Sequence, residues 1–406
     1  MTKFLGPYFI KPVLKEEVYP DFSMFVELER LFSKIVPGSI VRGALYMWNK
    51  DTGLNKSKYR EKWKEEPGNP LFVTDQFLLK SRDCDSQLIL DNYSSEYHKK
   101  TLKHLMVSLG EKNIFIDPRQ GENDPEYRRK LFESGERAKF GYMHDKFFLI
   151  SELEGIGKYV IIQLTANINV TQCHQFNNML VVYDDKDLFD KYLMHWDNLK
   201  NNIEMRNRGE TILNLNMFSE IPAEIDKESR AAVFFCPRKT CPIEFELRKI
   251  LNYAPSSRVK IDVAMAYLTR SNFADVLSKL KRNGCRVRIL LSEEVQNENA
   301  REFLRKYKLK YRILKNHMYN YETYTDENGK KRIQDNWKAR MHHKFVLIEN
   351  DRRYIVWTGS YNLTFPGLKL NDESVLRVCD KSVFRRYRKM FNLLWHPYCK
   401  FKKLMI

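Results

Sequence analysis

Apolar and amphipathic segments follow one another in the same order twice along the chain. An amphipathic pattern at residues 25–35 leads into a strand-like run at 40–48, and a similar pattern at 244–254 leads into a run at 258–268. Apolar residues spaced by three and four predict helices, whereas short runs rich in β-branched residues predict strands. A repeat on this scale predicts two copies of one structural unit.

The second half of each copy is the better preserved. GYMHDKFFLI at 141–150 is matched by ARMHHKFVLI at 339–348. Two more strand-like runs and a closing helical pattern follow in each copy. The three pairs are YVIIQLTANIN with YIVWTGSYNLT, FNNMLVVYDD with NDESVLRVCD, and DKDLFDKYLMHW with DKSVFRRYRKMF. Strands alternating with helices predict sheets that are covered by helices.

The fold class that these patterns predict is α/β, with two similar α-β-α lobes. We expect the lobes to comprise residues 1–205 and 231–406, to be joined by a polar linker at 206–230, and to pack about a pseudo-twofold axis. A length of 406 residues is enough for two to three domains. Because the chain contains both halves of the repeat, we expect a monomer.

Composition and charge narrow the function classes. The chain is 43% hydrophobic, which excludes a disordered or fibrous protein. It has 70 Lys and Arg against 52 Asp and Glu, so the formal net charge is +18. Such a surplus indicates a polyanionic partner: nucleic acid, an anionic phospholipid surface or a phosphate-bearing substrate.

Location is predicted from apolar runs and cysteines. No run reaches the roughly 18 uncharged apolar residues that a membrane helix needs, and Gly, Pro and Lys interrupt the first apolar patch. The seven cysteines are an odd number and are dispersed, which favours reduced thiols. We therefore predict a cytoplasmic protein, or a secreted one if its N-terminus has been processed.

Candidate catalytic residues lie on the two best-preserved strands. Side chains alternate between the faces of a strand, so His144 and Lys146 point the same way. By the same parity His342 and Lys344 share a face, and His343 points to the opposite one. We therefore predict that His342, and not its neighbour, belongs to the site.

An asparagine follows one strand later in each copy, Asn169 in TANIN and Asn362 in GSYN. Two facing halves would then supply two imidazoles, two ammonium groups and two amides around one phosphorus atom. One histidine can attack phosphorus and the other can protonate the leaving alcohol, while Lys and Asn stabilise the phosphoryl oxygens. This set predicts a phosphodiesterase that needs no metal and no cofactor.

The pattern HxK followed by GSxN, present twice, resembles the signature of the phospholipase D superfamily. The resemblance covers both halves of the chain and includes Ser360 of the GSYN segment. It implies a two-lobed fold and hydrolysis of a phosphodiester through a covalent phosphohistidine.

The motifs depart from that signature at a few positions. Glu349 stands where the family has an Asp, and Ser151 stands there in the first copy. Ala166–Asn167 replaces Gly–Ser. The tyrosyl-DNA phosphodiesterase branch of the superfamily also lacks the Asp and is active, so its loss does not imply an inactive protein.

The resemblance also implies partners for the two histidines. In the superfamily, groups on the strand after the Asn hold the histidine of the opposite lobe. Glu373 would then hold His144, and the aligned Asn178 would hold His342. A carboxylate stabilises a cationic imidazole, so we assign His144 as the nucleophile and His342 as the general acid.

The substrate is predicted from a basic and aromatic segment. Residues 301–315 carry seven cations, and tyrosines and a tryptophan follow at 319–337. Cations among rings are typical of a groove that tracks phosphates and stacks bases, and also of an interfacial lipid surface. The leading hypothesis is a nuclease-like enzyme; the alternatives are a phospholipase D acting on lipid head groups and a non-catalytic binding protein.

Overall fold

The computed structural model of the chain describes residues 2–12, 20–50, 66–92, 98–119, 141–210, 229–253, 258–293, 298–315, 317–325, 331–351 and 353–396. Side chains are described throughout these ranges except at 253, 298–300, 317–325 and 331–339.

The first lobe is built on a seven-stranded sheet with the order β1-β7-β6-β5-β2-β3-β4. β2, β3 and β4 run parallel to one another, and the other neighbours are antiparallel. The strands are β1 (Lys3–Phe9), β2 (Ile40–Leu45), β3 (Asp85–Asp91), β4 (Ile114–Asp117), β5 (Lys146–Leu153), β6 (Gly157–Leu164) and β7 (Asn178–Tyr183).

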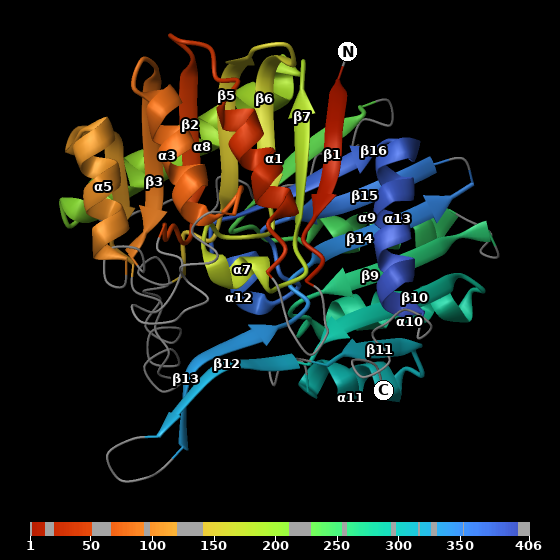
Figure 1. Cartoon of the computed structure of the whole chain (residues 1–406). Helices are drawn as coiled ribbons and strands as arrows, with labels where there is room; N and C mark the ends of the chain where they lie inside the picture. The colour runs from red at the N-terminus through yellow and green to blue at the C-terminus, as the bar shows by residue number, and fades with distance from the viewer. Residues whose placement is uncertain are drawn as a thin grey trace.

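The second lobe repeats this sheet strand for strand, in the order β8-β16-β15-β14-β9-β10-β11. Its strands are β8 (Ala231–Cys236), β9 (Lys260–Met265), β10 (Arg286–Ser292), β11 (Tyr311–Leu314), β14 (Lys344–Asn350), β15 (Arg353–Gly359) and β16 (Glu373–Cys379). An antiparallel hairpin of β12 (His317–Thr325) and β13 (Lys331–Ala339) precedes β14 and projects from the lobe (Figure 1).

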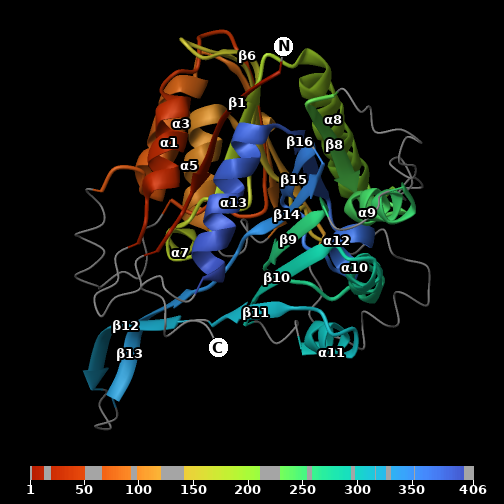
Figure 2. The same cartoon turned by 90° about the vertical axis from the view of Figure 1, so that its right-hand side faces the viewer.

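Helices cover the outer face of each sheet and fill the space between the sheets (Figure 2). The outer helices of the first lobe are α1 (Ser23–Phe32), α3 (Pro70–Ser81) and α5 (Lys99–Leu109), with the short η1 (Glu111–Asn113). Those of the second lobe are α9 (Pro242–Tyr253), α10 (Ser271–Arg282) and α11 (Glu298–Lys306). The other helices are α7 (Val170–Cys173), α8 (Lys186–Asn207), α12 (Phe365–Lys369) and α13 (Lys381–Trp395).

Three apolar cores follow from this layering. One lies in each lobe beneath the outer helices. The third lies between the sheets and combines α8 and α13 with strands of both lobes. α13 shows why such helices form: Asp380 caps its N-terminus at Val383 N, and its buried residues recur every three or four positions. The prediction of two similar α/β lobes is confirmed.

The lobe boundaries expected from the sequence, 1–205 and 231–406, stay a prediction. The two sheets use residues 3–183 and 231–379, whereas α8 continues through the predicted boundary to Asn207. Residues 211–228 of the expected linker lie outside the described residues.

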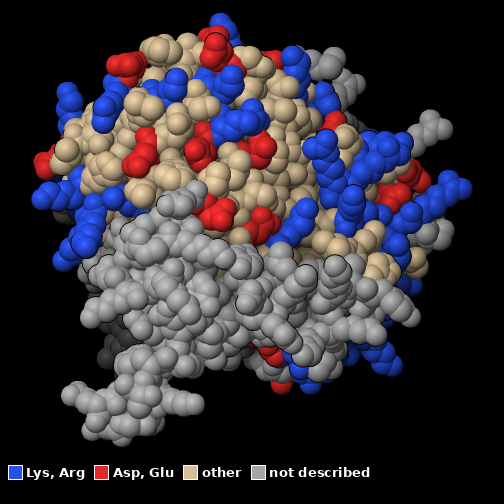
Figure 3. Space-filling view, in the orientation of Figure 1, with Lys and Arg blue, Asp and Glu red and all other residues tan. Residues whose placement is uncertain are grey.

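The composition led to predictions about surface charge, membrane-spanning helices and cysteines, which can be compared with the described part of the structure. In Figure 3, Lys and Arg are most numerous at the two sides of this face, and Asp and Glu are interspersed among them. Some of the positive charge is structural, because Arg388 of α13 forms ion pairs with Asp262 (2.8 Å) and Glu349 (3.1 Å). Among the described helices, none is both long and apolar enough to cross a bilayer. The six cysteines of the described ranges are free thiols.

Candidate active site between the two lobes

The segment that carries His144 crosses from its own sheet to the other lobe. Met143 N donates to Asp91 at the end of β3 (3.0 Å), which ties the segment to its own sheet. Met143 also forms a β-bridge with Asp372, and His144 N donates to Asp372 O (3.0 Å). β5 then begins at Lys146, where it enters the apolar core.

The second lobe repeats this crossing in the opposite direction. Met341 forms a β-bridge with Phe176 of the first lobe, and His342 N donates to Phe176 O (3.0 Å). β14 begins at Lys344, as β5 begins at Lys146. The two HxK segments therefore both lie at the junction of the lobes.

Each imidazole is held at Nδ1 by a group from the opposite lobe. His144 Nδ1 lies 2.8 Å from Glu373 Oε2, and His342 Nδ1 lies 2.8 Å from Asn177 Oδ1. The predicted contact between Glu373 and His144 is confirmed. Both partners offer an oxygen acceptor, which places the proton on Nδ1 and leaves Nε2 of each ring for chemistry.

The prediction that Asn178 holds His342 is wrong. Asn178 Nδ2 lies 3.1 Å from Nδ1 of His343, the histidine on the opposite face of β14. Its Oδ1 accepts from Thr358 Oγ1 (3.0 Å) and from the Tyr387 hydroxyl (2.8 Å). Asn178 is therefore part of the buried packing behind the site.

A one-residue difference between the lobes explains this error. Asp185 caps α8, which follows β7, and Asp380 caps α13, which follows β16. The first lobe has one additional residue, Asp184, between the strand and the cap. Asp184 has a φ of 57°, which accommodates the longer turn. When the two lobes are aligned backward from these caps without a gap, Asn178 is paired with Glu373. Allowing for the additional residue shifts the alignment by one position, so Asn177 is the true counterpart of Glu373.

Asn169 also has a different place from the predicted one. Its side chain accepts from Gln172 N (3.1 Å) and caps α7, as Thr364 accepts from Gly367 N (3.1 Å) and caps α12. Its predicted equivalence to Asn362 is therefore wrong.

Asn167 is the residue that corresponds to Asn362. The next residues, Ile168 and Leu363, form equivalent β-bridges to the segments after β2 and β9. The Oδ1 atoms of both asparagines are buried and have no hydrogen-bond partner in the described part of the chain. The sequence carried the signal, because YVIIQLTANIN and YIVWTGSYNLT align these two asparagines without a gap.

Hydroxyl groups support the partners of both histidines. The Ser360 hydroxyl hydrogen-bonds the Glu373 carboxyl, and its oxygen accepts from Ser374 N (3.0 Å). Thr165 occupies the same place in the first lobe, where its hydroxyl donates to Asn177 Oδ1 (3.0 Å). The predicted Ser360 thus lies directly behind Glu373.

The two lysines are buried beside the histidines. Lys146 Nζ donates to His144 O (2.8 Å) and lies 5.3 Å from the centre of the Tyr46 ring. Lys344 Nζ donates to His342 O (3.1 Å) and lies 3.2 Å from its Nε2. Burial lowers the pKa of Lys146 to about 8, although Glu373 counteracts it, and lowers that of Lys344 well below 10.5.

The imidazoles are shifted toward their neutral forms. Burial, and then the charges of Lys146 and Lys344, lower the pKa of His144 well below 6.5. Burial and Lys344 do the same to the pKa of His342, to which Lys146 and His144 also contribute. Burial raises the pKa of Glu373 to about 8. Lys146 and Lys344 thus each lower the pKa of both histidines.

Other predicted features lie outside this site. His343 is buried and contacts Phe9, Phe176 and Phe345, as the strand parity predicted. The aromatic residues of the predicted substrate segment lie on β12 and β13, outside the described side chains. In the described ranges, no group of three His, Cys, Asp or Glu is placed to hold a metal ion.

A two-lobed α/β protein with a His and a Lys from each lobe at one junction has the architecture of a phosphoryl-transfer site. Residues 250–395 match the family model described as cardiolipin synthase, PLD-like domain. The whole chain shares its fold with phosphatidylserine synthase of Haemophilus influenzae Rd KW20, with a TM-score of 0.57, 12% identity and coverage of 99% of this chain and 88% of the other.

Curated relatives of this chain carry the name mitochondrial cardiolipin hydrolase. The one from Chlamydomonas reinhardtii is 25% identical over 39% of this chain and 63% of its own length. The one from Xenopus laevis is 34% identical over 16% of this chain and 29% of its own length. The chain thus spans less than two thirds of the length of either relative. With the duplicated HxK segments, these similarities show that the chain belongs to the phospholipase D superfamily.

Proposed function

We propose that this protein is a phosphodiesterase that uses His144 as the nucleophile and His342 as the general acid. The observation that carries the proposal is the arrangement at the lobe junction. Each imidazole is held at Nδ1 by an acceptor from the other lobe, and a buried lysine lies beside each ring. Both Nε2 atoms are thereby left to act on one substrate phosphorus.

In the first step, Nε2 of neutral His144 attacks phosphorus and the bond to the leaving oxygen breaks. Cationic His342, protonated at both ring nitrogens, passes its Nε2 proton to that oxygen. Burial and then the neighbouring cations lower the pKa of His342, and the negative charge of a bound diester favours its protonated form. Lys146, Lys344 and the amides of Asn167 and Asn362 stabilise the phosphoryl oxygens.

In the second step, water attacks the phosphohistidine. The water gives one proton to His342, which is now neutral, and the bond from phosphorus to His144 breaks. Both imidazoles return to their starting states. While the ring is bonded to phosphorus it is cationic, which favours the ionised form of the Glu373 carboxyl beside Nδ1, and the two opposite charges stabilise each other.

The substrate we propose is a phospholipid. The curated relatives are named as cardiolipin hydrolases, and the matched family model is named for cardiolipin synthase. These names favour the lipid alternative over the nuclease that the charge pattern first suggested. The net charge of +18 suits an anionic lipid surface as well as it suits nucleic acid. The relatives' names also carry a mitochondrial location, so a cytoplasmic one stays only a prediction.

The test is a direct comparison of substrates in EDTA. Wild-type protein, His144→Ala and the control His104→Ala, which changes a histidine of α5, are incubated with cardiolipin vesicles, phosphatidylcholine vesicles, labelled single- and double-stranded DNA, and RNA. We expect head-group release from phospholipid that is lost in His144→Ala and retained in His104→Ala.

The other outcomes separate the alternatives. Cleavage of oligonucleotides without lipid turnover would restore the nuclease hypothesis. Binding without turnover on any diester would indicate the non-catalytic alternative. Activity that appears only after a divalent metal is added would contradict the proposed metal-independent mechanism.

A further inference from the structure

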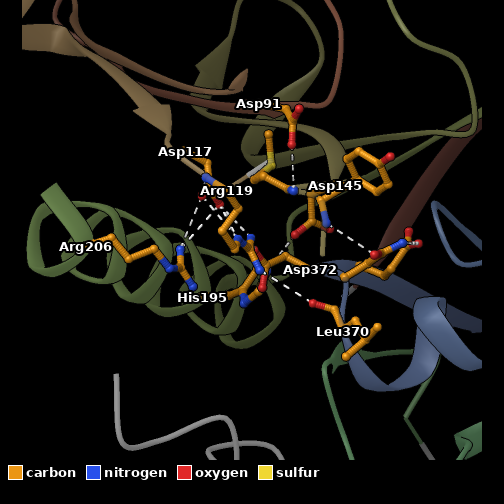
Figure 4. A network of polar contacts seen from close by, with 12 residues as sticks. Asp91, Asp117, Arg119, Asp145, His195, Arg206, Leu370 and Asp372 are labelled. Carbon is orange, nitrogen blue, oxygen red and sulfur yellow. Dashed lines mark hydrogen bonds and ion pairs between the residues drawn. The ribbon is translucent and has the colours of Figure 1, made fainter. Parts of the chain in front are cut away.

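Four charged side chains, three of them buried, form a network that joins the two lobes (Figure 4). Arg119, which follows β4, bonds the Asp117 carboxylate (2.5 and 2.9 Å), the Leu370 carbonyl (3.5 Å) and the Asp372 carboxylate. Arg206 of α8 lies 3.3 Å from Asp117. The side chains of Arg119 and Asp117 are each 1% exposed.

The network is connected to the site through Asp372. Its carbonyl accepts from His144 N (3.0 Å), and its own N–H donates to Tyr142 O (2.9 Å). The next residue is Glu373, whose carboxyl holds the His144 ring. Arg119 therefore binds Asp372, which holds the backbone of His144 and directly precedes the residue that holds its ring.

The charges in this network stabilise one another. Burial alone would raise the pKa of Asp117, but Arg119 and Arg206 outweigh it and hold that pKa below its usual value. Burial raises the pKa of Asp372, and Arg119 offsets part of that effect. Burial lowers the pKa of Arg206 to about 10. Replacing such buried ions with apolar groups often costs a protein no stability. Stability alone therefore does not explain why this junction contains ion pairs.

The second lobe shows that the lobe junction itself does not require ions. Phe176 stands in the place of Asp372, because its carbonyl accepts from His342 N as that of Asp372 accepts from His144 N. Leu314 at the end of β11 stands in the place of Asp117. Both are buried in the apolar core between the sheets. An apolar junction therefore suffices beside His342, whereas ion pairs hold the junction beside His144.

We propose that Arg119 is a positioning residue for the nucleophile. By fixing Asp372, it sets the Glu373 carboxyl and the backbone carbonyl that together orient His144. Apolar side chains can slide and rotate slightly against one another without losing their contacts. A guanidinium that bonds several partners at once holds those partners in one geometry. The inference rests on the proposed function for its effect on rate, and on the geometry alone for its effect on the His144 ring.

The test compares Arg119→Lys with the matched control Arg377→Lys. Arg377 lies on β16, the same strand as Glu373, and is 4% exposed in an ion pair with Glu246 (2.9 Å). NMR of ¹⁵N-labelled histidine reports the Nδ1 proton of His144, and single-turnover kinetics report phosphoenzyme formation. Thermal unfolding measures the stability that each variant loses.

We expect Arg119→Lys to weaken or abolish the downfield Nδ1–H signal of His144 and to slow phosphoenzyme formation by about 10- to 100-fold with little change in KM. We expect Arg377→Lys to keep the signal and to stay within about 2-fold of the wild-type rate at a similar loss of stability. The double variant Arg119→Lys/Glu373→Gln should be little slower than Glu373→Gln alone, because both changes release the same ring.

An unchanged His144 signal in folded Arg119→Lys would overturn the inference, as would a rate loss that the control shares or one additive with Glu373→Gln. If Arg119→Lys does not fold, the near-isosteric Asp372→Asn carries the same test with the same expectations. The NMR result stands even if the protein hydrolyses no diester, so failure of the proposed function and failure of this inference are distinguishable.

Discussion

The half-sites around His144 and His342 share one backbone framework and differ in the groups that hold it. A carboxyl holds the first ring and an amide holds the second, each at 2.8 Å from Nδ1. An ionic network supports the first junction, and apolar side chains support the second. A ring that must become covalently bonded and cationic benefits from a nearby negative charge and a fixed direction of attack. A ring that shuttles a proton needs neither to the same degree.

The largest expected effect comes from removing either histidine. His144→Ala and His342→Ala should each lower kcat by about 10⁴-fold, and the double variant should be little slower, because both rings act in one cycle. On a p-nitrophenyl phosphodiester, whose leaving group needs no protonation, His342→Ala should recover most of its phosphorylation rate. His144→Ala should not recover. The opposite pattern of rescue would exchange the assigned roles.

The next largest loss of rate is expected when the charge of either lysine is removed. Lys146→Met and Lys344→Met should each reduce the rate by about 10²- to 10³-fold, because each ammonium faces the developing charge in a buried site. Circular dichroism and thermal unfolding should show that both variants remain folded. A lysine variant with wild-type rate would remove that residue from the phosphate site.

The same lysines predict the pH dependence. Burial lowers the pKa of Lys146 to about 8 and that of Lys344 well below 10.5. The charged forms are the active ones, so activity should fall as pH rises through about 8 rather than near 10. Replacing the responsible lysine with Arg, which stays charged, should move this limb to higher pH. A rate that is flat from pH 7 to 10 would contradict the lowered pKa values.

Changing the partners of the histidines should have intermediate and unequal effects. Glu373→Gln should slow the reaction by about 10- to 100-fold, because it removes the carboxyl that stabilises the phosphorylated ring. Asn177→Ala should cost less, since the amide only orients His342. Equal losses, measured as phosphoenzyme formation in single turnovers, would remove the proposed functional difference between the half-sites. Asn178→Ala is the control, because its side chain bonds His343 instead.

The smallest effect on rate is expected at His343. Its ring is buried against aromatic side chains, and burial lowers its pKa to about 3. His343→Ala should lower the free energy of unfolding by roughly 2–4 kcal/mol through the cavity it leaves. The folded variant should keep kcat within a few-fold of wild type. A folded but inactive His343→Ala would show that this ring takes part in the chemistry.

The sequence by itself determined the duplicated α/β organisation and which face each site histidine and lysine uses. Those conclusions depend on local periodicity: residues two apart on a strand share a face wherever the strand lies. This is why His144, Lys146, His342 and Lys344 could be chosen, and why His343 could be set aside. The pairing of Glu373 with His144 came from family resemblance, and the contact between them is confirmed.

Only the tertiary structure decided the partners of the other residues. The additional Asp184 displaces β7 by one position, so the group that holds His342 is Asn177 rather than Asn178. Asn169 caps α7, and Asn167 corresponds to Asn362. Arg119 and Asp372 meet across the lobe junction although 253 residues separate them. Contacts of this kind depend on turn lengths and on how two sheets pack, and neither quantity is encoded in a periodic pattern along one segment.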